Sequence, residues 1–110
     1  MTLNDLREWG ANVDEGMARC INNEAFYLKM VGKCLEDHEF EALGDALDEG
    51  NIDKAFESAH ALKGVVSNLS LTPLQNKVSE ITELLRAKTE MDYSGLYQEI
   101  IGLKDELVLL

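Results

Sequence analysis

Apolar residues recur every three or four positions along nearly the whole chain, which is the period of helices that bury one face. No segment alternates apolar and polar residues convincingly enough to predict a strand. The pattern predicts two short helices near the start, around residues 3–9 and 14–21, and longer ones afterwards. The longer segments run from about Glu24 to Glu36, Phe40 to Gly50, Asn51 to Leu69, Pro73 to Leu85 and Ser94 to Leu107. Because the connections are short, we expect an all-α fold: an antiparallel up-down four-helix bundle with one or two short N-terminal helices covering an end.

Residues that start or stop helices support these boundaries. Gly50 follows an apolar-periodic segment and is expected to end it in a left-handed conformation. Pro73 suits the first turn of a helix, where its missing N–H is not needed. Asp14 and Ser94 are the expected N-caps, because their side chains can accept a hydrogen bond from a free backbone N–H. Within the second short helix, we expect Ile21 to point inward.

Length and composition indicate a single domain over residues 1–110. Apolar residues make up 45% of the chain, which is ordinary for a globular protein and too much for a disordered one. The formal net charge of −11 argues against nucleic acid and anionic membranes as partners, because both carry phosphate groups. This charge can serve solubility alone, or it can form a surface that meets a basic partner or one that carries a divalent cation.

Targeting signals and reactive thiol motifs are missing from the pattern. No run of about 18 apolar residues could span a membrane, and the first residues are too polar for a signal peptide. Cys20 and Cys34 form no C-x-x-C motif, so we expect reduced thiols in the core. These features predict a cytoplasmic protein. We expect a monomer, although the apolar end 107–110 could pack on its own bundle or on a neighbouring molecule.

The most informative segment is residues 56–66, FESAHALKGVV. At about 100° per residue, the apolar positions of this helix fall within an arc of roughly 140°, which forms the core face. His60 lies about 40° beyond one edge of that arc, and Gly64 and Ser67 lie on the same side. Lys63 lies at the edge, where its stem can cover apolar surface while the ammonium reaches water. His60, Lys63, Gly64 and Ser67 therefore line one strip of the helix.

These residue types in this arrangement suit phosphoryl chemistry. A neutral imidazole is a nucleophile near pH 7, because its pKa is about 6.5. The Lys63 ammonium can stabilise a phosphoryl group on the ring of His60. Glycine in a helix interior costs about 1 kcal/mol relative to alanine, which is acceptable where something must approach the backbone closely. The pattern alone also fits an exposed histidine without a function.

The strip carries a family resemblance. Residues 59–64, AHALKG, resemble the A-H-x-L-K-G signature of histidine phosphotransfer domains, the HPt family. Residues 39–59 are similar to the hairpin that precedes the histidine in that family, and residues 65–74 resemble the stretch that follows it. Residues 13–34 resemble the N-terminal helices of the family more loosely. The resemblance thus covers nearly the whole chain.

The resemblance implies a phosphocarrier in a multistep two-component phosphorelay, rather than an enzyme. His60 would accept a phosphoryl group on Nε2 from the aspartate of one receiver domain and pass it to another receiver. Lys63 would stabilise the phosphoryl group and Gly64 would leave room for it, with Ser67 beside them. The implied partners are response-regulator receiver domains, a hybrid histidine kinase, or both. The chain would bind no cofactor of its own, and the Mg²⁺ would come with the receiver.

Two further positions follow from the resemblance. The facing helix of the family carries polar side chains one turn apart, and Thr82 and Arg86 occupy the matching places. One departure is clear: Ser70 stands where the family usually has glycine, ten residues after the histidine. Serine is small, so we expect close helix packing to survive while the fine geometry changes.

Glu57 and His60 form an E-x-x-H pair, which is typical of di-iron sites in helical bundles. Such a site needs two of these motifs and two further glutamates. The only other histidine, His38, has Leu35 at the third position before it. We therefore expect no metal site in this chain.

Other interpretations concern the aromatic residues and the role of the whole chain. Trp9, Tyr93 and Tyr97 are expected as core or end-capping residues rather than a binding box. The main alternative function is a helical adaptor that binds receiver or other signalling domains without being phosphorylated. A fragment of a hybrid kinase is a third possibility. The start at Met1 and the end at Leu110, without flanking linkers, favour a standalone chain.

Overall fold

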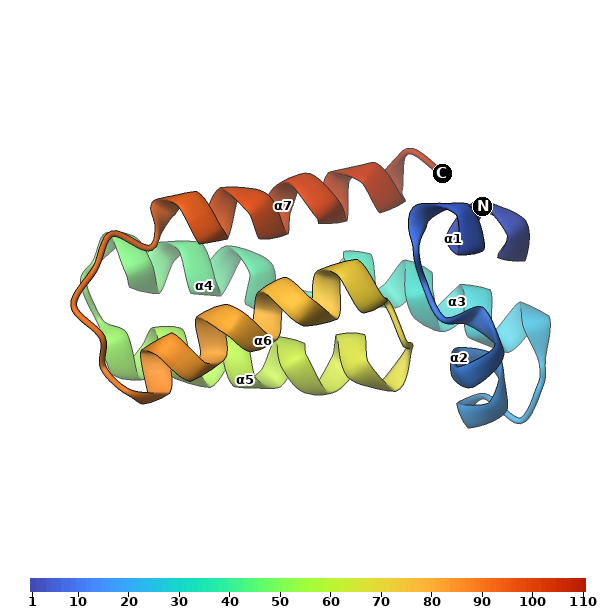
Figure 1. Cartoon of the computed structure of the whole chain (residues 1–110), viewed down its shortest axis with the longest axis horizontal. Coiled ribbons are helices and arrows are strands. Elements are labelled where there is room, and N and C mark those ends of the chain that lie inside the picture. Colours follow the sequence, from blue (N-terminus) through green and yellow to red (C-terminus); the bar gives the residue numbers. More distant parts are fainter.

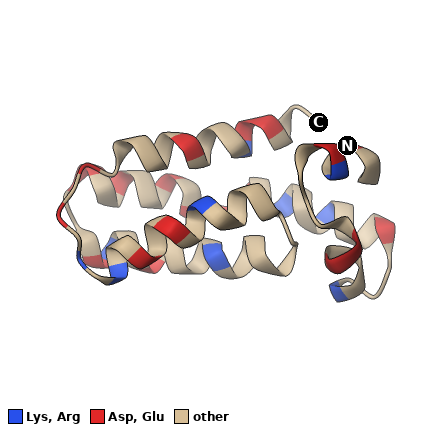
Figure 2. Cartoon of the chain, viewed as in Figure 1, with Lys and Arg blue, Asp and Glu red and all other residues tan.

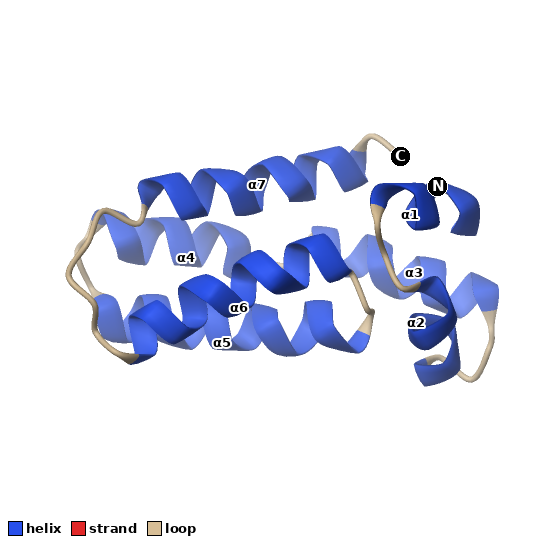
Figure 3. Cartoon of the chain, in the orientation of Figure 1, coloured by secondary structure: helices blue, strands red, loops and turns tan.

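The computed structural model describes all 110 residues and contains seven helices and no strand (Figures 1 and 3). The helices are α1 (Leu3–Trp9), α2 (Val13–Arg19), α3 (Glu24–Leu35), α4 (Glu39–Asp48), α5 (Ile52–Asn68), α6 (Thr72–Arg86) and α7 (Ser94–Val108). The predicted all-α fold is confirmed, and both short N-terminal helices are present. None of the seven combines the length and the apolar run that crossing a bilayer requires.

Five longer helices form the four legs of an up-down bundle, and the whole molecule is 41 Å long. Figure 1 shows α3 and α4 end to end along one leg, after which α5, α6 and α7 run in alternating directions. The leg is interrupted at Asp37, whose carboxylate accepts a hydrogen bond from the backbone N–H of Glu39 at 2.9 Å. This bond supplies one of the acceptors that the first turn of α4 lacks. The expected four-helix bundle therefore contains one leg made of two helices.

The buried face of α5 is the face that the apolar pattern predicts. Ala55, Ala59, Leu62 and Val66 are completely buried, and α5 contacts both α4 and α6. The stripe on α6 is equally buried and consists of Leu74, Val78, Ile81, Thr82 and Leu85. Each fully buried Val, Leu or Ile side chain contributes about 1.5–3 kcal/mol. This packing determines which side of α5 faces the solvent.

The two N-terminal helices cover the end of the bundle where both termini lie (Figure 1). The indole N–H of Trp9 donates to Glu106 of α7 at 3.0 Å. The backbone N–H of Asn12 donates to the carbonyl of Ser70 in the α5–α6 turn at 2.9 Å. Arg19 of α2 donates to the carbonyl of Ser67 at 2.6 Å. These bonds attach α1 to α7, and they attach α2 and its N-cap to the far end of the hairpin that carries His60.

Ser70 has a φ of +53° and is 1% exposed, in the turn between α5 and α6. A left-handed backbone favours glycine, which is a physical reason for the glycine that the family resemblance leads one to expect here. The serine hydroxyl donates to Glu15 at 2.9 Å and accepts from Arg19 at 2.8 Å. The departure from glycine therefore keeps the turn and adds a polar link to α2.

Three local predictions are wrong. Asn12 caps α2 in place of Asp14, because α2 begins earlier than the pattern suggested. The helix also ends two residues before Ile21, which lies in the following turn with 83% of its surface exposed. Ser94 does not cap α7: its backbone N–H donates instead to the carboxylate of Asp92 at 2.9 Å.

Other local expectations are met. Gly50 follows α4 with a φ of +69°, and Pro73 lies in the first turn of α6. Cys20 and Cys34 are buried and free, and burial raises the pKa of the Cys34 thiol to about 12. At the C-terminal end Leu107 is buried, whereas Val108 and Leu109 are exposed.

Candidate functional site

The strip predicted on α5 faces the solvent. His60 and Gly64 are exposed, and Lys63 and Ser67 are half-buried. A side chain added at Gly64 would have no atom within 4 Å of its Cβ. The ring of His60 therefore stands on an open helix surface, with a gap in the side-chain wall one turn further along. Because α5 packs against both α4 and α6, this surface lies on a helix whose position is determined by the core.

Phe56 supports the imidazole of His60. The two rings are stacked with their centroids 5.6 Å apart and their planes at 28°. The guanidinium of Arg86, from α6, lies over the same Phe56 ring at 4.9 Å from its centroid, which is within cation–π range. Phe56 thus holds the histidine in place and brings a cation from the facing helix to its side. As one of the apolar positions of this helix, Phe56 was expected on the core face, and the structure shows it half-buried beside the imidazole.

Glu83 of α6 joins the two cations of the site. Its carboxylate lies 3.4 Å from Nζ of Lys63 and 3.2 Å from Nε of Arg86, through different oxygens. The hydrogen bond from Arg86, and with it the ammonium of Lys63, hold the pKa of Glu83 below its usual value. The carboxylate is therefore ionised at neutral pH. The contacts therefore run from His60 through Phe56 to Arg86 and Glu83 on α6, and they return to α5 at Lys63, one turn after His60.

Sequence reasoning missed Glu83 altogether. The only signal was its place three residues before Arg86, which puts both on one helix face. That spacing does not reveal that Lys63 of another helix approaches the same carboxylate.

The two polar positions carried over to α6 behave differently. Arg86 is exposed and joins the cluster around His60 through Phe56 and Glu83. Thr82 is completely buried, and its hydroxyl donates to the Val78 carbonyl of its own helix at 2.6 Å. The expectation that Thr82 offers a polar group at the site surface is therefore wrong. It lies four residues after Val78, on the core stripe, and that spacing was visible in the sequence.

Ser67 is the member of the strip nearest the C-terminal end of α5. Its backbone carbonyl accepts the hydrogen bond from Arg19 of α2, and its side chain is half-buried. Through this bond α2 borders the strip, and a partner that covers the strip as far as Ser67 would meet Arg19.

Charge is distributed unevenly over the bundle (Figure 2). Helix α4 carries Glu39, Glu41, Asp45 and Asp48 and no lysine or arginine. On α5, by contrast, no carboxylate follows Glu57, so the half-helix around His60 and Gly64 is neutral apart from Lys63. Beyond Glu57, α5 thus adds no negative charge that would repel an anionic group, and the Glu83 carboxylate of α6 is paired with Lys63 and Arg86.

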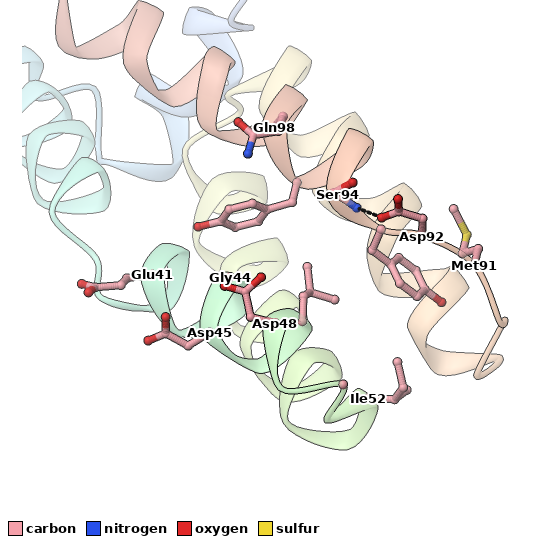
Figure 4. Close-up of a pocket in the computed structure, with 13 residues that line it drawn as sticks. Glu41, Gly44, Asp45, Asp48, Ile52, Met91, Asp92, Ser94 and Gln98 are labelled. Carbon is pink, nitrogen blue, oxygen red and sulfur yellow. Dashed lines mark hydrogen bonds between the residues drawn. The ribbon is translucent and has the colours of Figure 1, made fainter.

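A separate cleft of about 410 Å³ lies between α4 and the start of α7 (Figure 4). Figure 4 shows the carboxylates of Glu41, Asp45, Asp48 and Asp92 around it. None of the residues of the His60 strip lines this cleft. No three His, Cys, Asp or Glu side chains anywhere in the chain are arranged to hold a metal ion. The cleft is therefore unrelated to the exposed imidazole.

Comparison with known proteins yields one match. The family model described as the Hpt domain matches residues 33–109. This range contains the end of α3 and the whole of α4, α5, α6 and α7, and it leaves α1 and α2 outside. No curated protein and no solved structure matches the chain.

Proposed function

The chain belongs to the Hpt domain family, whose members carry out histidine phosphotransfer in phosphorelays, and we propose that it is a phosphocarrier with His60 as its phosphoacceptor. The observation that carries this proposal is the exposed His60 ring on a packed helix, beside a lysine and an open position at Gly64. His60 would receive the phosphoryl group from the aspartyl phosphate of one receiver domain and deliver it to the aspartate of another.

The transfer requires little covalent chemistry from this chain. The lone pair of Nε2 attacks phosphorus, the N–P bond forms, and the P–O bond to the aspartyl carboxylate breaks with its electron pair on oxygen. A neutral imidazole that carries its proton on Nδ1 keeps that proton and becomes a phosphoimidazolium. Phosphoryl transfer depends mainly on position and charge neutralisation. The receiver's Mg²⁺ would supply much of the neutralisation on the donor side.

The remaining residues of the strip have distinct roles in this proposal. Stacking on Phe56 orients the imidazole, so that less orientational freedom is lost during transfer. Lys63 would pair with the phosphoryl oxygens, with Arg86 contributing from α6. Gly64 leaves the space into which the receiver's acidic pocket descends, and Ser67 would lie at the edge of the contact.

The absence of carboxylates on α5 after Glu57 favours such a partner. A receiver pocket presents several carboxylates around its cation, and like charges across an interface are strongly unfavourable. The proposed partners are therefore receiver domains, with or without a hybrid histidine kinase. We propose that the protein acts in the cytoplasm as a monomer.

The test is transfer from a phosphorylated receiver in the presence of Mg²⁺. The chain should gain one phosphate that is labile in acid and stable in base, and His60→Gln should abolish this gain. His38→Gln is the matched control, because His38 is the only other histidine and its side chain is 83% exposed in a charged turn. Phosphate that persists in His60→Gln would overturn the assignment. Receiver binding without any phosphorylation of the wild type would instead indicate an adaptor.

A further inference from the structure

Glu83 forms ion pairs with both of the cations that a phosphoryl group on His60 would use. Its two oxygens are divided between Lys63 on α5, at 3.4 Å, and Arg86 on its own helix, at 3.2 Å. Both ion pairs are partly exposed, so they can open without disturbing the core. Arg86 also has a second anchor over Phe56, and Phe56 touches the His60 ring. Arg86 therefore keeps its contact with Phe56, the residue stacked on His60, when it leaves Glu83.

A phosphoryl group and a carboxylate compete for the same donors. A phosphoryl group carries about −1.5 to −2 charges at neutral pH and has three acceptor oxygens, whereas Glu83 carries a single charge. The phosphoryl group is the stronger competitor for Lys63, and the freed carboxylate of Glu83 then repels the phosphoryl group. Each donor that turns to the phosphoryl group would weaken a resting ion pair with Glu83, and the pair would form again when the phosphate leaves.

We propose that Glu83 is a positioning residue that acts as an internal stand-in for the phosphate: it holds Lys63 and Arg86 while His60 is bare, and it lowers the stability of phosphorylated His60. This inference rests on the proposed function and deepens it. The carboxylate keeps the cations ordered for the incoming phosphoryl group. It also keeps the phosphorylated state from becoming a trap, so that transfer onward to a receiver remains favourable.

The change Glu83→Gln removes the negative charge but keeps the size of the side chain. Exposed ion pairs are individually weak, so two of them correspond to a change of about three- to tenfold in an equilibrium constant. The equilibrium constant for transfer from a phosphorylated receiver to His60 should rise by about this factor. The return transfer to the receiver should slow correspondingly.

Glu80→Gln is the matched control. Glu80 lies one turn earlier on α6 and pairs with Lys77 at 3.4 Å rather than with a residue of the site. The substitution therefore removes the same charge from the same helix without touching the site. It should leave the transfer equilibrium unchanged. Combining Glu83→Gln with Lys63→Met should give less than the product of the two separate effects, because both changes act on one contact. If Glu83→Gln leaves the equilibrium constant unchanged or lowers it while His60 is still phosphorylated, the inference is wrong.

A second arm separates this inference from the proposed function. Phosphoramidate phosphorylates histidine without any protein donor: the ring nitrogen attacks phosphorus, and the N–P bond to the departing ammonia breaks. In a His38→Gln background only His60 can be labelled. The change in melting temperature on phosphorylation should be more positive with Glu83→Gln than with Glu83 by about 3 to 8 °C. An equal change would refute the role of Glu83, whereas failure of every receiver to donate would refute only the relay.

Discussion

Gly64→Ala should stabilise the protein and slow phosphotransfer at the same time. Gly64 lies inside α5 and faces solvent, and an added Cβ would meet no atom within 4 Å. The folded state therefore accepts the methyl group without a clash. In an exposed helix interior, alanine is favoured over glycine by about 0.8–1.0 kcal/mol. For a domain of this size, that gain corresponds to an increase in melting temperature of about 4–6 °C.

The same methyl group stands in the space that a receiver's active site would need above His60. Reacting atoms must approach to about 3–3.5 Å, and small displacements at that distance are costly. We expect transfer from a phosphorylated receiver to slow by about tenfold with alanine, and further with Gly64→Gln. A residue that only packs in the fold would lose stability and activity together, so opposite signs are the distinguishing result.

The assay combines thermal unfolding with single-turnover transfer under one set of conditions. Gly102→Ala is the matched control, because Gly102 lies within α7, is exposed, and also has open space around its Cβ. It should raise the melting temperature by a similar amount and leave transfer unchanged. Normal transfer by both Gly64→Ala and Gly64→Gln would refute the idea that this position is kept open for a partner. A loss of stability in Gly64→Ala would refute the account of the folded state.

Two further predictions concern the fold. Because Ser70 has a φ of +53°, Ser70→Gly should be more stable than Ser70→Ala by about 1 kcal/mol in urea unfolding; both lose the hydroxyl, so equal stabilities would contradict the strain argument. The pKa of the Cys34 thiol is raised to about 12 by burial and, secondly, by Asp37. Because this pKa is raised in the folded state, the contribution of the protonated thiol to stability is fully present below the unfolded pKa and is lost as the pH rises. The free energy of unfolding should thus fall from about pH 9 upward. Cys34→Ala should make this fall shallower without removing it, because the pKa of Tyr27 is also raised to about 12; an unchanged pH profile would argue against the buried thiol as a cause.

The order of the helices and the outward face of α5 could be predicted from local pattern. The angle between His60 and the apolar arc is a property of one helix. Because Ala59 and Leu62 are buried, α5 must turn His60 toward the solvent. The open position at Gly64 followed from the same geometry. Local rules failed at the ends of α2 and α7, where Asn12 and Asp92 took over roles assigned to their neighbours. Several polar residues near a helix end can accept the same free N–H groups.

The sequence pattern does not distinguish glycines that pack against another helix from glycines that face solvent. In the sequence Gly16, Gly44 and Gly64 are alike, each inside a helical segment. In the structure, a Cβ at Gly16 would lie 2.6 Å from the Tyr27 ring, and one at Gly44 would lie 2.5 Å from the Tyr97 hydroxyl, whereas Gly64 faces open space. Two of these glycines therefore admit an aromatic ring from another helix, and only the third is available to a partner.

The sequence by itself determined that this chain is helical and that one helix presents His60, Lys63 and Gly64 along a single strip, because the helical period relates residues a few positions apart. Only the tertiary structure decided what faces that strip. The register and rotation of α6 against α5 depend on how the buried side chains of both helices interlock, and no short-range rule contains that information. The same packing turned Thr82 into the core and brought Glu83 between Lys63 and Arg86.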